Sequence, residues 1–445
     1  MNRALHRDNV ASAEALARDC RRIALPLQGP AGLDPLIARI AQARVVLLGE
    51  ASHGTSEFYV WRAHMSRRLV EDHGFRFIAV EGDWPDCFAV NRYVKHRPGT
   101  PSSARDALRV FQRWPTWMWA NWEVVALAEW LRRHNADRPE EQRVGFYGLD
   151  VYSLRESLEA VLEYLERVDG QAMAAARAAM RCFEPYLEDV HDYARAAARL
   201  VPESCAEEAV DLLVSLRAAA LPPEPGDPES AFAADQNALV VRDAEAYYRA
   251  MIRGGPWSWN MRDRHMWATL ERLLDFHGPA SRAIVWEHNT HIGDARFTDM
   301  AAAGMVNVGQ LAREALGEDQ TALVGFSSHR GSVIAGHEWG APLHRMHVPP
   351  AREGSWEDVL HRAGVGDSLL LMDRAAAPHL AEPRGHRAIG VVYDPETERW
   401  GNYVPTVMPR RYDALIHLEE TRALHPLRLE ALEDEEPPDT YPWGV

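Results

Sequence analysis

The sequence predicts an α/β fold in which a largely parallel β-sheet is flanked by helices and carries an inserted helical subdomain. Short aliphatic runs alternate with longer segments of helical periodicity along most of the chain, which is typical of parallel strands joined by covering helices. Between residues 155 and 252 the aliphatic runs disappear, and segments rich in Ala, Leu and Glu replace them. We therefore expect one α/β domain over residues 33–430. The helical insertion at residues 155–252 either lengthens the fold or walls the site at the sheet.

The first predicted strand covers residues 44–48 and ends at Gly49, where the backbone can bend. A helix is predicted over residues 56–73 because apolar side chains recur there at near-helical spacing, and Gly74 follows as a stop signal. The apolar positions are Phe58, Trp61, Met65 and Leu69. The predicted solvent-facing positions are Arg62, Arg67, Arg68, Glu71 and Asp72.

Further predicted strands share the pattern of an aliphatic run followed by polar side chains. They cover residues 77–80, 144–150, 283–286, 322–326, 368–372 and, as the last strand, 388–393. Ligands of parallel sheets bind outside the carboxyl ends of the strands, so we expect the polar residues found there to form a site. These residues are Glu50, His53, Glu81, Asp83, Asp150, Glu287, His288, His291, His329 and Asp373.

Composition excludes some classes of partner. The chain has 445 residues, 47% of them hydrophobic, and a net charge of −16. Nucleic acids and anionic membranes are bound through an excess of Lys and Arg, so neither is expected as a partner. The sequence indicates no oligomeric state.

The ends of the chain and its cysteines favour a cytoplasmic protein. The first twenty residues lack a continuous apolar run, so neither a signal peptide nor a membrane span is predicted. Cys20, Cys87, Cys182 and Cys205 form no C-x-x-C pattern and are expected to be reduced thiols that do not bind zinc. The acidic, Pro-interrupted segment 431–445 is predicted to be a disordered tail.

The segment VVLLGEASHGTSE, residues 45–57, is the strongest functional motif. His53 is suited to accept a proton because imidazole titrates near neutral pH, and a carboxylate such as Glu50 or Glu81 would fix its tautomer and raise its basicity. Such an arrangement activates water. Ser56 is placed to cap the predicted helix. The alternative is that Glu50 and His53 only stabilise the turn.

A second motif, WEHNTHIGD at residues 286–294, follows the strand at residues 283–286. Its two histidines are three residues apart, which differs from the i, i+4 helical placement of a zincin, so a role without metal is the simpler interpretation. We expect His288 to donate a hydrogen bond to a developing oxyanion or to position the substrate, assisted by Asn289. His291 either joins them or supports the turn.

Two further segments have weaker functional interpretations. WSWNMRDRHM, residues 257–266, opens a predicted helix, where Arg262 would clamp an anion and Asp263 would orient a histidine; charged residues in a first turn are nevertheless often plain surface residues. In WPTWMWANW, residues 114–122, Trp117 and Trp119 either line an apolar cleft or pack in the core.

Several common motifs are absent from the sequence. It contains no G-x-S-x-G nucleophile elbow, no G-x-x-x-x-G-K-[ST] phosphate loop, and no G-x-G-x-x-G after a predicted strand. A serine hydrolase of the elbow type and a nucleotide-binding protein are therefore disfavoured.

GEASHGTSE, VEGD, NMRDRHM and WEHNTHI, in this order, resemble the erythromycin esterase family over residues 33–420. The resemblance implies an α/β core with helical additions. Resistance esterases of this family open a macrolide lactone by hydrolysis without needing a metal or other cofactor. EGDWPD and FQRWPTWMW look more like a broad environmental branch of the family than its macrolide-resistance members.

The resemblance also implies roles for individual residues. His53 matches the general base, His288 the second essential histidine, and Glu50 and Glu81 the acidic residues of the site. Arg262, Asp263 and Glu57 lie in matching motifs and are expected to contact substrate. Two positions depart from the resistance esterases: Ser52 stands where threonine is frequent, and Glu287 where alanine is common.

Three hypotheses follow. The leading one is a cytoplasmic, metal-independent hydrolase of an ester or lactone, with His53 as the base. The second uses the same His and Glu residues as ligands of zinc or manganese. The third is a non-catalytic protein that binds haem or another apolar ligand through the tryptophans and a histidine.

Overall fold

The computed structural model describes residues 2–168, 172–186, 204–251, 255–372 and 378–428. The chain divides into two compact units. The first comprises residues 1–78, 104–130 and 280–445, and the second residues 79–103 and 131–279. Asp373 and the predicted tail at 431–445 lie outside the described residues.

The first unit contains a mixed sheet in the order β1-β8-β11-β6-β2-β5, with β7 beside β6. Strands β5, β2, β6 and β11 run parallel, whereas β8 and β7 pair antiparallel with β11 and β6. A two-stranded antiparallel ladder joins β9 and β10. The strands of this unit are β1 (Ala24–Pro26), β2 (Val45–Leu48), β5 (Ala283–Trp286), β6 (Thr321–Ala335), β7 (His344–Val348), β8 (Ser368–Leu371), β9 (Arg384–Arg387), β10 (Tyr403–Thr406) and β11 (Ala414–Thr421).

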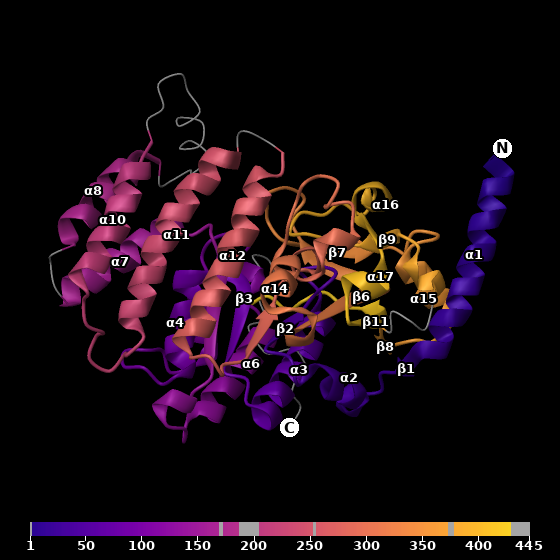
Figure 1. Cartoon of the computed structure of the whole chain (residues 1–445), viewed down its shortest axis with the longest axis horizontal. Helices are drawn as coiled ribbons and strands as arrows, with labels where there is room; N and C mark the ends of the chain where they lie inside the picture. Colours follow the sequence, from indigo (N-terminus) through magenta and orange to yellow (C-terminus); the bar gives the residue numbers. More distant parts are fainter. Residues whose placement is uncertain (1, 169–171, 187–203, 252–254, 373–377, 429–445) are drawn as a thin grey trace. The chain divides into compact units, whose positions relative to one another are not determined.

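The helices of the first unit are α1 (Asn2–Ile23), α2 (Asp34–Ile40), α3 (Ser56–His73), α5 (Ala104–Ala107), most of α6 (Trp122–Asn135), α13 (Asn289–Ile292), α14 (Val308–Leu316), α15 (Trp356–Ala363), α16 (Glu398–Gly401) and α17 (Met408–Arg411). Of these, α1, α13, α14 and α15 contact strands of the sheet, and α1 runs beside α15 (Figure 1). Short 3-10 helices include Pro30–Leu33, Leu108–Val110, Thr116–Met118, Ala295–Phe297, Glu318–Gln320 and Pro378–Ala381. The α/β fold predicted from the sequence is confirmed.

The predicted helix at residues 56–73 is confirmed as α3, and Gly74 terminates it in the left-handed conformation with φ of 70°. Ser56 does not cap this helix, contrary to expectation. Thr55 is the N-cap residue, and the Ser56 hydroxyl instead donates to Glu123 Oε1 at 2.5 Å. The helix is therefore tied to α6 through a buried side-chain hydrogen bond.

Strand boundaries differ from the prediction by more than one residue in four places. Strand β3 (Phe77–Asp83) continues beyond its predicted end at residue 80, so Glu81 and Asp83 lie within the strand and not after it. Strand β6 continues through Ala335, so His329 lies within the strand and not after it. Residues 388–393 contain only isolated bridges, at Ile389 and Val392. The last sheet strand is β11, which the sequence pattern missed because polar residues such as His417 interrupt its aliphatic run.

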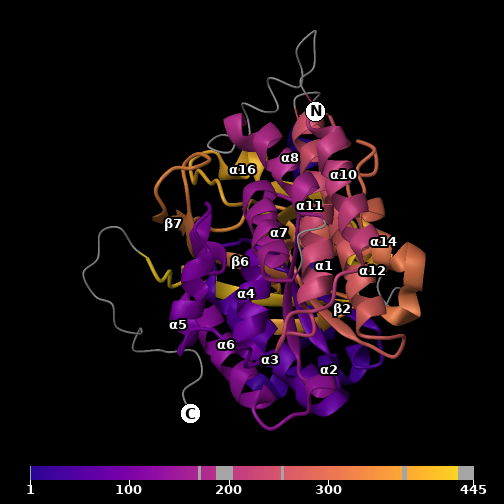
Figure 2. The ribbon, with the colours of Figure 1, turned by 90° about the vertical axis from the view of Figure 1, so that its left-hand side faces the viewer.

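The second unit holds most of β3 (Phe77–Asp83) and β4 (Gly145–Asp150), which are neighbours in a sheet. Its helices are α4 (Trp84–Val94), α7 (Leu154–Val168), α8 (Met173–Phe183), α10 (Ala206–Ala219), α11 (Ser230–Met251) and α12 (Trp257–Phe276), with 3-10 turns at Glu140–Gln142 and Glu184–Tyr186. Helices α7, α8, α10 and α11 lie side by side (Figures 1 and 2). They bury one shared apolar cluster, which includes Leu158, Phe183, Leu212 and Val241.

The described part of residues 155–252 is thus helical, but its treatment as a separate inserted domain stays a prediction. Cys182 and Cys205 form a disulfide, so the expectation of four reduced thiols is wrong for this pair. The fold brings together two cysteines that are 23 residues apart, which no local spacing rule detects. Cys20 and Cys87 are free thiols in buried positions.

Within the described residues, no helix combines the length and the hydropathy that crossing a bilayer requires.

Candidate active site

The carboxyl ends of β2 and β5 lie side by side in the first unit, because Leu48 is paired with Trp286 in parallel register. The polar segments that follow the two strands are joined directly, since the Asn289 backbone N–H donates to the Glu50 carbonyl oxygen at 2.9 Å. Gly49 permits this approach: a Cβ atom there would lie 2.1 Å from Asn289 Oδ1. The sequence motifs GEASH and WEHNTH therefore converge, as the pattern of strand ends predicts.

Glu50 connects His53 to a buried arginine. Its Oε1 lies 2.8 Å from His53 Nδ1, and its Oε2 accepts from Arg62 Nη2 at 2.5 Å. All three side chains are buried. The Arg62 guanidinium also lies over the rings of Tyr59 and Trp286, at 4.4 and 4.7 Å from their centroids. A paired cation makes an ionised carboxylate tolerable in this dry environment.

Arg62 lies in the core and not on the solvent-facing side of the helix, where the sequence predicts it. It is fully buried, whereas Trp61 is only partly buried. A sequence signal existed: Arg62 is four residues after Phe58 and three before Met65, which places it on the same helix face. Arg62 was predicted to face solvent only because its side chain is charged.

The hydrogen bonds of His288 define its tautomer. His288 is the N-cap residue of α13, and its Nδ1 accepts from the Thr290 backbone N–H at 3.3 Å. The Thr290 hydroxyl is 2.8 Å from the same nitrogen. A nitrogen that accepts from a backbone N–H carries no proton, so in the neutral ring the proton is on Nε2.

His53 has the opposite tautomer. Its Nδ1 faces the Glu50 carboxylate, which only accepts, so this nitrogen carries the proton and Nε2 carries the lone pair. The ring centroids of His53 and His288 are 4.9 Å apart. The pair thus offers one imidazole nitrogen suited to accept a proton and one suited to donate a hydrogen bond, which general base catalysis with oxyanion stabilisation requires.

Other predicted site residues of this unit have structural roles, through hydrogen bonds to nearby backbone or through burial. The Asn289 side-chain amide pairs with the Phe326 backbone: its Nδ2 donates to the carbonyl at 2.7 Å, and its Oδ1 accepts from the N–H at 3.2 Å. His291 is buried within α13. Glu57 accepts from the backbone N–H and Nε of Arg422, at 2.8 and 3.1 Å. Asn289 and Glu57 therefore fix the strand ends.

Trp117 and Trp119 are buried, with 1% and 5% of their surface exposed. The Trp119 ring contacts Tyr59 edge to face, with centroids 6.1 Å apart, and Tyr59 in turn contacts Trp286. Because Tyr59 also stacks on Arg62, this aromatic group packs behind the Glu50 and Arg62 pair. The packing interpretation accounts for both tryptophans.

The second unit contains a separate charged cluster at the ends of its two strands. Arg262 donates to both carboxylate oxygens of Asp150, at 2.9 and 2.6 Å, and to Glu81 Oε1 at 2.7 Å. Its guanidinium lies 4.9 Å from the Tyr152 ring centroid. The side chain of Arg262 is 13% exposed and Asp263 is fully buried, so neither is a plain surface charge.

Electrostatics of this cluster favour the charged forms. Burial raises the pKa of Asp150, but the Arg262 guanidinium outweighs burial and holds the carboxyl below its usual range. For Arg262, burial lowers the pKa, and Asp150, Tyr152 and Glu81 together raise it well above the usual value. Asp150 and Arg262 therefore each stabilise the charged form of the other.

Metal ligation by the predicted His and Glu set receives no geometric support within the first unit. Among the described residues, one group of three or more His, Cys, Asp or Glu has ligand atoms within 4.8 Å of one another, and it comprises His329, His361 and Glu419. His53, His288 and Glu50 are not in it. Glu50 already uses its two oxygens for His53 and Arg62.

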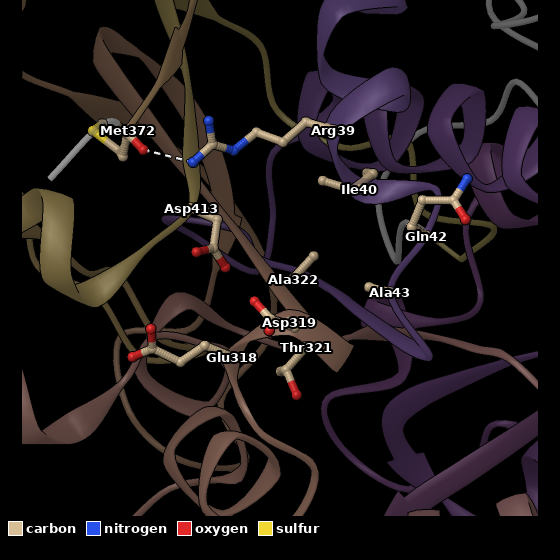
Figure 3. A pocket seen from close by; sticks show the side chains of 10 residues that line it. All are labelled: Arg39, Ile40, Gln42, Ala43, Glu318, Asp319, Thr321, Ala322, Met372 and Asp413. Carbon is tan, nitrogen blue, oxygen red and sulfur yellow. Dashed lines mark hydrogen bonds between the residues drawn. The ribbon is translucent and has the colours of Figure 1, made fainter.

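A cavity of about 460 Å³ lies at the opposite ends of the first unit's strands, beside the paired residues Val45 and Thr321 (Figure 3). Arg39 Nη2 donates there to the Met372 carbonyl oxygen at 2.7 Å. The Asp413 carboxylate accepts hydrogen bonds from Arg313 Nη2 and from the Leu323 backbone N–H. Because ligands of α/β sheets bind beyond the carboxyl ends of the strands, this cavity is not the candidate active site.

Comparison with known proteins identifies the family. A family model described as erythromycin esterase matches residues 70–421, which is most of the chain. The chain belongs to the erythromycin esterase family. The resemblance noted in the sequence is thereby confirmed, and membership supports a hydrolase of the esterase type.

Individual relatives are distant. The chain is 24% identical to erythromycin esterase type II of Escherichia coli over 357 residues, which cover 76% of this chain and 82% of that protein. The solved structure of a mutant of the erythromycin esterase EreC in its open conformation matches with a TM-score of 0.64 and 17% identity, over 92% of this chain and 97% of the other. A protein described as a succinoglycan biosynthesis protein matches with a TM-score of 0.70 and 19% identity, over 92% and 98%. These two structures support the fold alone.

Proposed function

We propose that this family member hydrolyses a small-molecule ester or lactone, with His53 as the general base and without a metal at the catalytic centre. The observation that carries the proposal is the pair of hydrogen bonds, from His53 Nδ1 to Glu50 and from the Thr290 N–H to His288 Nδ1, which imply opposite tautomers for two rings 4.9 Å apart at the ends of two parallel strands. Neither nucleic acid nor a membrane is proposed as a partner, since the net charge is −16. A cytoplasmic location stays a prediction, and the disulfide between Cys182 and Cys205 removes part of the argument for it.

The proposed reaction needs only water as the second substrate. His53 Nε2 takes a proton from water while the water oxygen bonds to the carbonyl carbon. The carbonyl π electrons move onto oxygen, and the His288 Nε2–H donates to the resulting oxyanion. When the tetrahedral intermediate collapses, the C–O ester bond breaks and the alkoxide receives the proton from the His53 imidazolium. A lactone opens to a hydroxy acid.

Glu50 and Arg62 position the base. The Glu50 carboxylate holds His53 in the productive tautomer and stabilises the imidazolium that forms, and Arg62 donates to the other oxygen of that carboxylate and fixes its orientation. The sequence-based assignment of Glu81 to water polarisation stays a prediction. Substrate contact by Arg262 and Asp263 likewise stays a prediction, as does hydrolysis of any macrolide.

The test is turnover of a panel of esters and lactones, erythromycin included, by the wild type, His53→Ala and His347→Ala. His347 is exposed on β7 and serves as the matched histidine control. Loss of a general base costs about 10²- to 10⁴-fold in rate, so we expect a loss of that size for His53→Ala and wild-type rates for His347→Ala. An unchanged rate for His53→Ala would defeat the proposal.

Two controls separate the alternatives. Hydrolysis that stops when the wild type is treated with EDTA, and returns when zinc or manganese is added, would favour metal-dependent chemistry. Binding of haem by a non-catalytic protein predicts Soret absorbance for the purified or haem-reconstituted chain and no turnover of the panel.

A further inference from the structure

A second cluster of histidines lies on the face of the first unit's sheet that α15 covers. His329 lies in β6, His361 in α15 and Glu419 in β11, and their ligand atoms all lie within 4.8 Å of one another. His329 is one of the polar residues that the strand pattern predicts for a site, yet the proposed hydrolysis uses none of the three. Strands β6 and β11 pair in parallel, with Ser327 opposite His417.

Alternation along the two strands brings the side chains onto one face. The Ser327 hydroxyl is 2.9 Å from His417 Nδ1, so these two side chains share a face of the sheet. Side chains two residues further along a strand return to that face, which places His329 and Glu419 beside each other. Two of the three groups are therefore held on rigid, hydrogen-bonded backbone.

The third group comes from the covering helix. The His361 ring stacks on the His329 ring with centroids 3.8 Å apart and an angle of 6° between the planes. His361 Nδ1 is 2.5 Å from Glu419 Oε1. Exposure rises across the cluster: His329 is buried, Glu419 half-buried and His361 exposed. The cluster thus has a fixed inner side and an open outer side through which an ion and water can enter.

Two buried imidazole nitrogens of this cluster lack hydrogen-bond partners within the described parts of the chain. One is Nδ1 of His329, whose residue is 6% exposed, and the other is Nε2 of His417, which is fully buried. Buried polar nitrogens without partners are uncommon and call for an ion, a ligand or a water. His417 Nε2 is 3.8 Å from Glu419 Oε2, so it faces the same carboxylate.

We propose that His329, His361 and Glu419 bind one divalent transition-metal ion of the zinc type, at a site separate from the His53 and His288 pair. Two imidazoles and a carboxylate suit Zn²⁺, Co²⁺ or Ni²⁺, whereas Mg²⁺ and Ca²⁺ prefer sites made of oxygen ligands. Water completes the coordination on the exposed side. His417 orients the Glu419 carboxylate from beneath.

Binding requires a modest adjustment of the outer ligand. Ligand atoms of a tetrahedral zinc ion lie about 3.3 Å apart, because zinc–nitrogen and zinc–oxygen bonds are about 2.0–2.1 Å long. His361 is exposed and can reorient, so the hydrogen bond between His361 and Glu419 is exchanged for two bonds to the ion. The ion then joins β6, β11 and α15.

The experiment is a Co²⁺ titration of the full-length chain after EDTA treatment and dialysis, followed by visible d–d absorption. We expect one equivalent to bind the wild type. His361→Ala and Glu419→Gln should each weaken binding at least about 100-fold, since each removes a ligand. Both positions are partly or fully accessible, and circular dichroism verifies folding.

Two variants serve as controls. His347→Ala removes an exposed histidine outside the cluster, and His53→Ala removes the proposed general base; both should bind Co²⁺ as the wild type does. The proposal is overturned if the wild type shows no saturable binding, if binding survives in His361→Ala, or if binding is lost in His53→Ala, which would place the ion at the candidate active site.

Discussion

The buried pair between Arg62 and Glu50 predicts a large, local loss of stability when its cation is removed. In Arg62→Met the aliphatic stem remains, but the carboxylate of Glu50, 2% exposed, loses the guanidinium that lies 2.5 Å away. Removing one partner of a buried ion pair costs about 3–5 kcal/mol, because the other charge stays buried without compensation. We expect the free energy of unfolding to fall by that amount.

A control on the same helix makes the test specific. Arg68 of α3 forms a pair with Asp34 at the same distance of 2.5 Å, but the two side chains are 31% and 66% exposed. Exposed pairs contribute about 0–1 kcal/mol, so Arg68→Met should barely change stability. Urea unfolding followed by tryptophan fluorescence measures both variants. Equal losses in Arg62→Met and Arg68→Met would refute the reasoning.

A double variant shows whether the loss of stability in Arg62→Met comes from the buried Glu50 carboxylate that no longer has a cation beside it. Arg62→Met combined with Glu50→Gln removes both charges, so it should recover part of the stability that Arg62→Met loses. Esterase activity should not return with it, because a neutral amide no longer stabilises the imidazolium of His53. A double variant less stable than Arg62→Met alone would show that the carboxylate is not the stranded group.

Three further predictions concern the surrounding structure. Gly54→Ala should destabilise the chain by at least about 1–3 kcal/mol in urea unfolding, because a Cβ there would lie 1.9 Å from the Ile334 carbonyl oxygen; wild-type stability would contradict this packing. Burial raises the pKa of Glu357, but His386 and the Arg387 backbone N–H outweigh burial and hold the pKa at about 2 against a usual 4.5. The ionised carboxylate therefore contributes about 3 kcal/mol to the free energy of unfolding. This contribution is complete above pH 4.5 and is lost as the pH falls toward 2. Urea midpoints measured from pH 5.5 to 3.5 should fall more steeply for the wild type than for Glu357→Gln, and identical slopes would refute the assignment. A thiol titration of the denatured, unreduced chain should give the two thiols of Cys20 and Cys87, and four thiols would disprove the disulfide between Cys182 and Cys205.

Local sequence patterns predicted where most strands end and which motifs follow them. Helix α3 and strand β5 have the predicted boundaries, because periodicity and stop signals are local. The meeting of Glu50 with His53 was also readable, since three residues separate them across one turn. The long extension of β6 was not readable: its polar residues pair with β11, a strand about 90 residues later in the chain.

Contacts between distant segments escaped prediction for the same reason. The burial of Arg62 depends on Glu50 and on Trp286, which comes from a different strand. The cluster of His329, His361 and Glu419 is assembled from two strands and a helix. Helical spacing places Arg62 on the buried face of α3 but does not identify its partners, and no local spacing brings the three residues of the cluster together. Tertiary packing alone creates a dry pocket around a charge.

The proposed mechanism requires that Glu50 and the first turn of α13 hold His53 and His288 in opposite tautomers. Two-bond ¹H–¹⁵N correlation spectra of the histidine-labelled chain at neutral to mildly alkaline pH report the tautomer of each ring. His53→Gln and His288→Gln assign the two sets of signals. We expect a protonated Nδ1 and a bare Nε2 for His53, with the reverse for His288. Identical tautomers, or a bare Nδ1 in His53, would rule the mechanism out.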